Sequence, residues 1–217
     1  METYKLILTL ESDATFGRGD GVAGLVDTEV EHDRYGMPYL RGRTLKGLLA
    51  EECANILFAL DERAAHWHTA AQRLFGRPGS TLEDSAMMRV SDACLPADLR
   101  AAVAADVEAG KYSATDVLES LTAIRRQTAM DETGVPVRGS LRATRVTLRQ
   151  TAFEADLSFV EPVTQDDQAL LAACAMALRR VGTGRNRGRG RVTSRLIDAH
   201  EQDVTDTHFA RFEEVLR

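Results

Sequence analysis

Two segments of the chain carry apolar side chains at the spacing of an amphipathic helix. In residues 44–60 apolar positions recur every three or four residues, opposite a charged and polar face. Residues 164–181 repeat this spacing, and Thr164 stands where an N-cap belongs. Arg179 and Arg180 fall in the predicted last turn, where the helix dipole favours cations, and a glycine follows as a stop signal.

Alternating and β-branched runs predict strands elsewhere. These runs occupy residues 4–10, 86–92 and 191–199, and two further runs within 141–160 suit a pair of strands. Shorter helical patterns occupy residues 64–74, 96–110, 113–124 and 209–216, and Arg-Pro-Gly-Ser at 77–80 breaks the first of them. Two long helices over an antiparallel sheet predict an α+β fold. The ferredoxin-like arrangement, also called RNA-recognition-motif-like, is the natural candidate.

The composition is that of a globular protein, because 44% of the 217 residues are hydrophobic. No apolar run approaches the roughly 18 residues of a membrane span, and the first residues read as a strand rather than a signal peptide. Cys53, Cys94 and Cys174 are odd in number and form no Cys-x-x-Cys pair. These features predict a cytoplasmic protein without membrane contact, disulfide framework or structural zinc.

The net charge of −6 alone argues against nucleic-acid binding, but the distribution of the charge matters more. Residues 179–195 contain seven arginines and no acidic residue, and residues 138–149 contain four more arginines, again without an acid. Only three lysines occur in the chain, so its positive charge is nearly all guanidinium. Guanidinium makes planar two-point contacts to phosphate, so these patches could hold a polyanion on an acidic protein.

The glycine-rich segment at 182–192, GTGRNRGRGRV, is the most informative motif. Its glycines let the backbone approach another chain closely, and Arg185, Arg187, Arg189 and Arg191 supply phosphate contacts. It lacks the Gly-Lys-Ser/Thr of a P-loop, and it closes a helix and opens a strand, which is the reverse of a Rossmann fingerprint. The pattern favours nucleic-acid binding over the alternative of a solvated turn.

A second segment, residues 17–49, combines acids with a basic helix start. The acids are Asp20, Asp27, Glu29, Glu31 and Asp33, and the cations are Arg41, Arg43 and Lys46. A helix N-terminus with nearby cations is a ready phosphate site. A carboxylate beside a bound phosphodiester could position a divalent metal or help to deprotonate a hydroxyl. Composition alone, however, favours a solvated acidic loop.

The remaining candidates are weaker. His66 and His68 lie two apart, on different faces of the predicted helix, and make a poor metal pair. Asp131 and Glu132, in Asp-Glu-Thr-Gly, are typical turn residues.

Three segments together resemble one known family. The segment DTEVEHDRYGMPYLRGRTLKGLL resembles the N-terminal signature of the RAMP superfamily of CRISPR-associated proteins, matched here by Gly36, Pro38, Tyr39, Gly42, Leu45, Lys46 and Gly47. GTGRNRGRGRV resembles that family's C-terminal glycine-rich loop. Residues 122–146 are similar to the middle segment of backbone subunits in type III systems, including subtypes III-A and III-D. The three matches lie in the family's order and span most of the chain.

The resemblance implies a single RAMP domain over residues 1–217, with a helical insertion at 61–120 and a thumb hairpin at 121–150. It implies that the chain binds CRISPR guide RNA and target single-stranded RNA beside other effector subunits. It further implies that Arg185, Arg187, Gly188, Arg189 and Arg191 contact the guide RNA. Arg41, Arg43 and Lys46 would contact phosphates near the first helix.

The resemblance also implies metal-dependent cleavage of target RNA, with Mg²⁺ or Mn²⁺ and with the RNA's own 2′-hydroxyl as nucleophile. Asp27 matches the catalytic and metal-supporting aspartate, and Asp33 matches a second acid that stabilises the loop. The family often has apolar residues between these acids, whereas this chain has Glu29, Glu31 and His32.

Two alternatives stay open. One is a structural subunit of the same assembly that binds RNA without cutting it. The other is a guide-processing endoribonuclease, a class that uses a histidine general base near the first helix, for which His32 and His66 are available.

Overall fold

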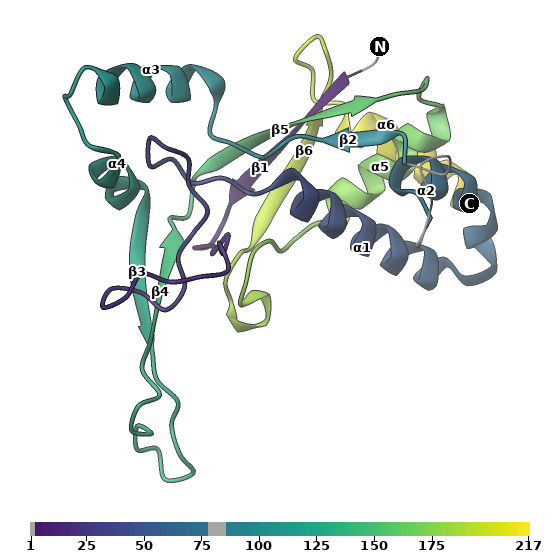
Figure 1. Cartoon of the computed structure of the whole chain (residues 1–217). Helices are drawn as coiled ribbons and strands as arrows, with labels where there is room; N and C mark the ends of the chain where they lie inside the picture. The colour runs from purple at the N-terminus through teal and green to yellow at the C-terminus, as the bar shows by residue number, and fades with distance from the viewer. Residues whose placement is uncertain (1–2, 78–85) are drawn as a thin grey trace.

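The structure, a computed structural model, describes residues 3–77 and 86–217. Its centre is a four-stranded sheet in the order β2-β5-β1-β6, in which every neighbouring pair is antiparallel. The strands are β1 (Thr3–Leu10), β2 (Met88–Val90), β5 (Ala152–Phe159) and β6 (Val192–Ile197). Helix α1 (Gly42–Leu60) connects the first two of these strands, and α5 (Gln165–Ala177) connects the last two. This order is the ferredoxin-like topology, so the predicted α+β fold is confirmed (Figure 1).

The core lies between one face of the sheet and the helices. Along β1, every second side chain is buried, from Tyr4 to Leu10, and β5 alternates in the same way. Helix α5 is buried almost all round because its alanines let α1 and α6 (Thr205–Leu216) approach closely. No helix in residues 3–77 or 86–217 has both the length and the apolar character that crossing a membrane requires.

The opposite face of the sheet is polar. Its positions on the long strands hold Lys5, Ile7, Thr9, Glu154, Asp156, Ser158, Thr193, Arg195 and Ile197, and Lys5 pairs with Glu154 at 3.1 Å. None of these positions carries an aromatic side chain, so this face offers no platform on which bases could stack.

Residues 61–120 hold η1 (Asp61–Trp67), α2 (His68–Phe75), α3 (Ala97–Glu108) and α4 (Ala114–Leu121). The segment predicted as a helical insertion also contributes the edge strand β2 to the central sheet. Of the predicted break at 77–80, residues 78–80 lie outside the described part of the chain. The helix predicted for 113–124 ends at Leu121, where Thr122 turns to an extended backbone and begins the next strand.

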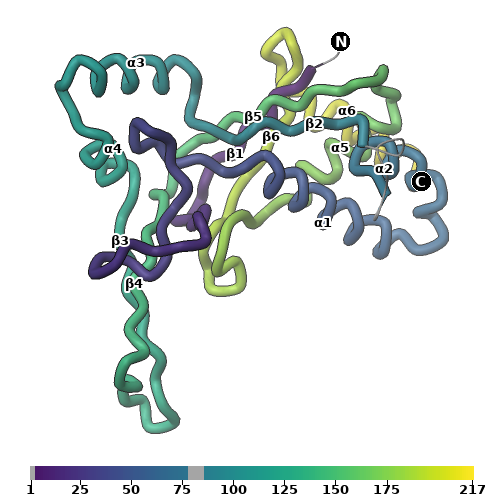
Figure 2. Tube along the Cα trace, viewed as in Figure 1, coloured from purple at the N-terminus to yellow at the C-terminus, as the bar shows by residue number. Residues whose placement is uncertain are grey.

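A hairpin extends away from this body. Strands β3 (Thr122–Gln127) and β4 (Arg142–Thr147) pair antiparallel, from Thr122 opposite Thr147 to Gln127 opposite Arg142. The connecting residues 128–141 reach far beyond the sheet (Figure 2). The two strands predicted within 141–160 both exist, but β4 belongs to this hairpin and β5 to the central sheet.

Helix α5 ends earlier than its sequence pattern indicates. Thr164 forms the predicted cap, as a capping box with Asp167, but the last helical residue is Ala177. Arg179 and Arg180 therefore lie on an extended segment beyond the helix and not in its last turn. The helix stops because Val181 is fully buried and donates its N–H to Gly190 O at 2.8 Å.

Candidate nucleic-acid interface

The glycine-rich loop, residues 182–191, is fixed to the segment that follows β1 by backbone hydrogen bonds. Thr183 N donates to Thr15 O, and Gly190 N donates to Asp13 O, both at 2.9 Å. Gly190 has φ +70° and packs so tightly that a Cβ would lie 1.9 Å from the carbonyl oxygen of Val181. Glycine is required here, and the loop has a defined path although much of it is exposed.

The four arginines of the loop have different surroundings. Arg185 pairs with Glu51 at 3.1 Å, and Arg191 pairs with Glu11 at 3.3 Å. Arg187 and Arg189 form no ion pair within the described residues. Gly188 between them has φ +78°, and no heavy atom lies within 4 Å of its ideal Cβ position. The centre of the loop therefore presents two uncompensated guanidinium groups and an open stretch of backbone.

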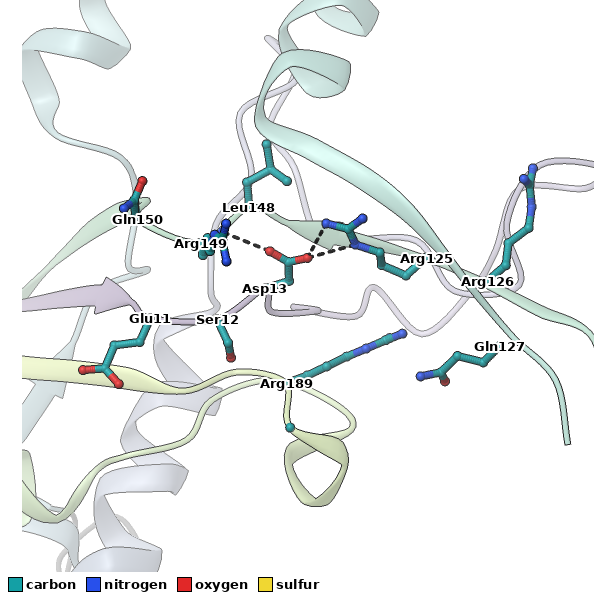
Figure 3. Close-up of a pocket in the computed structure, with 11 residues that line it drawn as sticks. Glu11, Ser12, Asp13, Arg125, Arg126, Gln127, Leu148, Arg149, Gln150 and Arg189 are labelled. Carbon is teal, nitrogen blue, oxygen red and sulfur yellow. Dashed lines mark hydrogen bonds and ion pairs between the residues drawn. The ribbon is translucent and has the colours of Figure 1, made fainter. Parts of the chain in front are cut away.

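A cleft of about 740 Å³ separates this loop from the base of the hairpin. We call it the arginine cleft; it is lined by Glu11, Ser12, Asp13, Arg125, Arg126, Gln127, Leu148, Arg149, Gln150, Gly188 and Arg189. Figure 3 shows Arg189 extending across it toward Gln127, with Asp13 at its centre. The segments that meet here follow β1, precede β5 and β6, and belong to β3. The cleft is thus built at one end of the sheet.

Three cleft arginines, Arg125, Arg126 and Arg149, were not among the sequence-predicted site residues. Arg149 belongs to the acid-free run 138–149, which marks it in the sequence as part of a positively charged patch. Nothing in that run indicates that Arg149 lies beside the glycine-rich loop. Arg125 donates two hydrogen bonds to Asp13, at 2.9 and 2.7 Å. Arg126 and Arg149 make no side-chain ion pair in the described chain.

A second cleft, of about 870 Å³, lies on the other side of the glycine-rich loop, against α1. It contains Arg179, Arg180, Arg185 and Arg187, but also Glu51 and Glu52. Arg180 donates to the carbonyl oxygen of Arg185. Each cleft thus contains four arginines and two acids. An ion pair engages Arg125 in the arginine cleft and Arg185 in the second cleft, where Arg180 is also bound to a loop carbonyl.

The start of α1 is less open than its sequence indicates. Asp92 accepts a hydrogen bond from Gly42 N at 2.7 Å, so the protein itself satisfies one of the helix-start amides. The Lys46 ammonium donates to Met88 O at 2.6 Å, and burial lowers the pKa of Lys46. Arg41 pairs with Glu31 at 2.6 Å. The Arg43 side chain is exposed and makes no hydrogen bond or ion pair within the described residues.

A small pocket nevertheless brings the two predicted motifs together. It measures about 210 Å³ and is lined by Phe16, Gly17, Glu31, Leu40, Arg41, Thr44, Leu48, Gly182, Thr183 and Arg185. The helix start, the first loop and the glycine-rich loop are therefore neighbours, as an extended interface along this end of the sheet requires.

Asp27 lies against the hairpin. Its backbone N–H donates to Ala143 O at 2.7 Å, and its carboxylate Oδ2 accepts from Ala143 N at 2.6 Å. The side chain is exposed, and Oδ1 makes no hydrogen bond within the described residues. In the hairpin register Ala143 pairs with Arg126, so Asp27 and an arginine of the cleft flank the same position of β4.

Asp33 has the stabilising role that the resemblance implies. Its carboxylate accepts hydrogen bonds from Tyr35 N at 2.9 Å and Met37 N at 3.0 Å, which closes the turn before α1.

Glu29 and Glu31 are buried, with 2% and 6% of their surface exposed, so the alternative of a solvated acidic loop is wrong for these two acids. Glu29 pairs with Arg145 at 2.8 Å. Glu31 bonds to Tyr39 at 3.2 Å, and desolvation together with the charge of Glu31 raises the pKa of Tyr39. The sequence could not reveal the partner of Glu29, because Arg145 lies 116 positions away.

Among the described residues, no group of three or more His, Cys, Asp or Glu side chains could hold a metal ion. Asp27 offers a single open carboxylate oxygen. Mg²⁺ is often bound by one or two carboxylates plus phosphate oxygens and water. Asp27 could supply the one carboxylate of such a site, with RNA phosphate oxygens and water as the remaining ligands.

Comparison with solved structures yields the same fold. A chain of the type III-B Cmr-beta bound to cognate target RNA, determined by cryo-EM, superposes with a TM-score of 0.64 at 14% identity, covering 89% of this chain and 96% of that one. A chain of the type III-B Cmr-beta in the apo state gives 0.64 at 13% identity, covering 90% and 97%.

No curated protein matches the chain in sequence. The family model of the RAMP superfamily matches residues 7–193, which is most of the chain and includes the first loop, the hairpin and the glycine-rich loop. The chain therefore belongs to the RAMP superfamily.

Proposed function

We propose that this chain is an RNA-binding subunit of a type III CRISPR effector complex. The observation that carries the proposal is the arginine cleft, where arginines from β3, the segment before β5 and the glycine-rich loop converge although they are far apart in sequence. Family membership and the fold shared with type III-B chains support the same assignment. Assignment of the chain to subtype III-A or III-D remains a prediction.

The cleft has the charge that a nucleic-acid backbone needs. Arg126, Arg149 and Arg189 form no ion pair with the described residues, so phosphates could compensate them without displacing a protein carboxylate. The uncovered Gly188 lets a backbone pass close to the loop. We assign the guide RNA to this cleft, with Gly188 and Arg189 as its principal contacts, and to the other side of the loop, where Arg187 lines the second cleft.

The hairpin supports contact with a second strand. Its tip exposes four large apolar side chains, Met130, Val135, Val137 and Leu141, each at least 44% accessible. Exposed apolar residues on a projecting arm are costly in water and suit insertion beside unstacked bases. We assign the target RNA, and the neighbouring effector subunits, to this side of the molecule.

The further proposal is cleavage of the target RNA at Asp27. The open oxygen of Asp27 lies at the edge of the hairpin, where it could accept the proton of an RNA 2′-hydroxyl or help to bind Mg²⁺ or Mn²⁺. A divalent ion held by Asp27 and RNA oxygens would neutralise charge on the phosphate that is attacked. The chain would position the reacting groups, and the RNA would supply the nucleophile.

A non-catalytic subunit of the same complex is the second candidate. It is favoured by the bond between Asp27 Oδ2 and Ala143 N, which gives this carboxylate a structural role. The histidines of a guide-processing enzyme are poorly placed: His32 Nδ1 lies 3.0 Å from the carbonyl oxygen of Asp33, and His66 pairs with Asp166 on the helical side.

RNA binding is tested with the full chain and labelled single-stranded RNA, titrated between about 50 and 200 mM salt. Replacing Arg187 and Arg189 with glutamine should weaken binding and reduce the slope of log K against log salt by about 1.4, since each lost phosphate contact removes about 0.7. The matched control replaces Arg63 and Arg217, which are exposed arginines remote from the cleft. Equal affinity of the loop variant and wild type would refute the assignment.

A further inference from the structure

We propose that Glu29 and Arg145 are positioning residues for Asp27. Their buried ion pair holds the loop that carries Asp27 in a fixed register on β4. The inference deepens the proposed cleavage function and rests on it.

The pair is buried, and Arg145 contacts Glu29 through its Nε nitrogen. Arg145 is 5% exposed and Glu29 is 2% exposed. Arg145 Nε lies 2.8 Å from Glu29 Oε1 and 3.1 Å from Oε2, and Arg145 Nη1 donates to Thr122 Oγ1 at 3.2 Å. The guanidinium thus contacts the loop carboxylate and β3 at the same time, and its planar geometry restricts both partners.

Backbone bonds place this pair next to the Asp27 contact. Arg145 N donates to Thr28 O at 3.0 Å, while Asp27 and Ala143 exchange the two hydrogen bonds described above. Glu29 is two residues after Asp27, and Arg145 is two residues after Ala143. In extended chains, side chains two positions apart point to the same side. The buried pair and the Asp27 bond are therefore consecutive contacts of one parallel ladder, and a slip of that ladder would move both.

The chemistry of the pair favours a role in register over a role in general stability. Removing two charges from water offsets most of their mutual attraction, so an apolar pair could fill this space equally well. An apolar pair, however, would accept several registers, whereas a guanidinium that bonds Glu29 through Nε and Thr122 through Nη1 accepts one. The exposed residues 18–25 contact Glu29 through the backbone, since Arg18 N donates to Glu29 O and Glu29 N donates to Asp20 O, both at 2.9 Å. The ion pair with Arg145 is the contact by which the Glu29 side chain is tied to the hairpin.

The test combines amide exchange with RNA cleavage. In Glu29→Gln, the exchange rate of the Ala143 amide should rise about tenfold or more, as expected for loss of a hydrogen bond to a charged acceptor. Target-RNA cleavage by the effector complex should fall by about the same factor, while RNA affinity stays within about twofold, since both residues are buried and neither lines the arginine cleft. Arg145→Lys keeps both charges but removes the planar group that bonds Glu29 and Thr122 at the same time, so it should give a smaller change of the same kind.

The control is Asp167→Asn. Asp167 is fully buried and pairs with Arg73 at 3.2 Å on the helical side of the molecule. Its loss should lower the melting temperature without changing Ala143 exchange. Asp27→Ala, which removes the acceptor itself, sets the upper limit of the exchange rate.

The outcomes separate this inference from the proposed function. If the wild-type complex does not cut RNA, the cleavage function is wrong. Faster Ala143 exchange in Glu29→Gln would then still show that the ion pair holds the Asp27 loop in its register on β4. If Ala143 exchange is unchanged in both Glu29→Gln and Arg145→Lys, the inference is overturned, whatever the cleavage rate. Faster exchange with an unaltered cleavage rate would also overturn it, because the pair would then have no effect on the reaction.

Discussion

Asp13 and Arg125 join the central sheet to the hairpin across 112 positions of sequence. The carboxylate oxygen Oδ2 of Asp13 accepts from Arg125 Nε at 2.9 Å and from Nη2 at 2.7 Å, while Oδ1 accepts from Arg149 N at 3.2 Å (Figure 3). One carboxylate thus holds two sides of the arginine cleft together. It also places a negative charge at the point where we assign RNA phosphates.

Asp13→Asn should therefore strengthen RNA binding. The substitution keeps an acceptor for Arg149 N but frees the Arg125 guanidinium for phosphate, so the salt slope should increase by about 0.7. The ion pair is partly exposed, so the free energy of unfolding should fall by less than about 1 kcal/mol. Filter binding and chemical denaturation measure the two effects. Weaker binding at unchanged stability would mean that phosphates do not enter the cleft beside Arg125.

Gly190→Ala should destabilise the protein much more than Gly188→Ala. Both glycines have positive φ, which costs other residues about 1–2 kcal/mol. At Gly190 the added Cβ would also lie 1.9 Å from Val181 O, whereas at Gly188 it meets nothing within 4 Å. We expect a loss of about 3 kcal/mol or more at Gly190 and about 1 kcal/mol at Gly188, measured by urea denaturation. Similar losses at the two positions would contradict the tight packing at Gly190.

Asp33→Ala should destabilise the first loop by about 1.5–3 kcal/mol, because two backbone N–H groups lose a charged acceptor. Asp33→Asn retains an acceptor oxygen and is the matched control, with a smaller loss. RNA affinity should stay at the wild-type level in both variants once the protein is folded. A specific loss of RNA binding in Asp33→Asn would assign Asp33 to the interface instead of the turn.

The turn at the hairpin tip should loosen in acid. Asp131 accepts hydrogen bonds from Thr133 Oγ1, Thr133 N and Val135 N, and the bond from the Thr133 hydroxyl is the main cause that lowers the pKa of Asp131. Because the pKa of Asp131 is lower in the folded turn than the ordinary aspartate value of 3.8, the charged carboxylate stabilises the turn fully at pH values above 3.8. This stabilisation is lost as the pH falls through the folded pKa.

NMR shifts of the Thr133 and Val135 amides should therefore titrate below pH 3.8 and be constant at neutral pH. The same amides in Asp131→Asn should show no such titration. A midpoint at or above the ordinary aspartate value would mean that the turn does not favour the charged carboxylate.

Local patterns predicted most of the helices and strands because local interactions decide them. Thr164 caps α5 through a bond to the nearby Asp167, and alternation along residues 4–10 reflects one buried sheet face. The errors occur where distant contacts decide. Helix α5 ends at Ala177 because Val181 binds Gly190, and Thr122 leaves the helical pattern because it pairs with Thr147.

The site divides in the same way. The glycine-rich loop is visible in the sequence because its arginines and glycines are contiguous. The arginine cleft is not, since Arg125, Arg149 and Arg189 meet only when the hairpin folds against the end of the sheet. The burial of Glu29 likewise depends on Arg145, which no local pattern identifies.

The proposed function is tested most directly by target-RNA cleavage in the effector complex with Mg²⁺ or Mn²⁺, comparing wild type with Asp27→Ala. We predict that wild type cuts the RNA at regular positions and that Asp27→Ala does not. RNA affinity of the variant should stay within about twofold of wild type, because Asp27 does not line the arginine cleft. If the variant still cuts at the same positions, the chemistry lies elsewhere, and if both complexes bind RNA and neither cuts, the chain is a structural subunit.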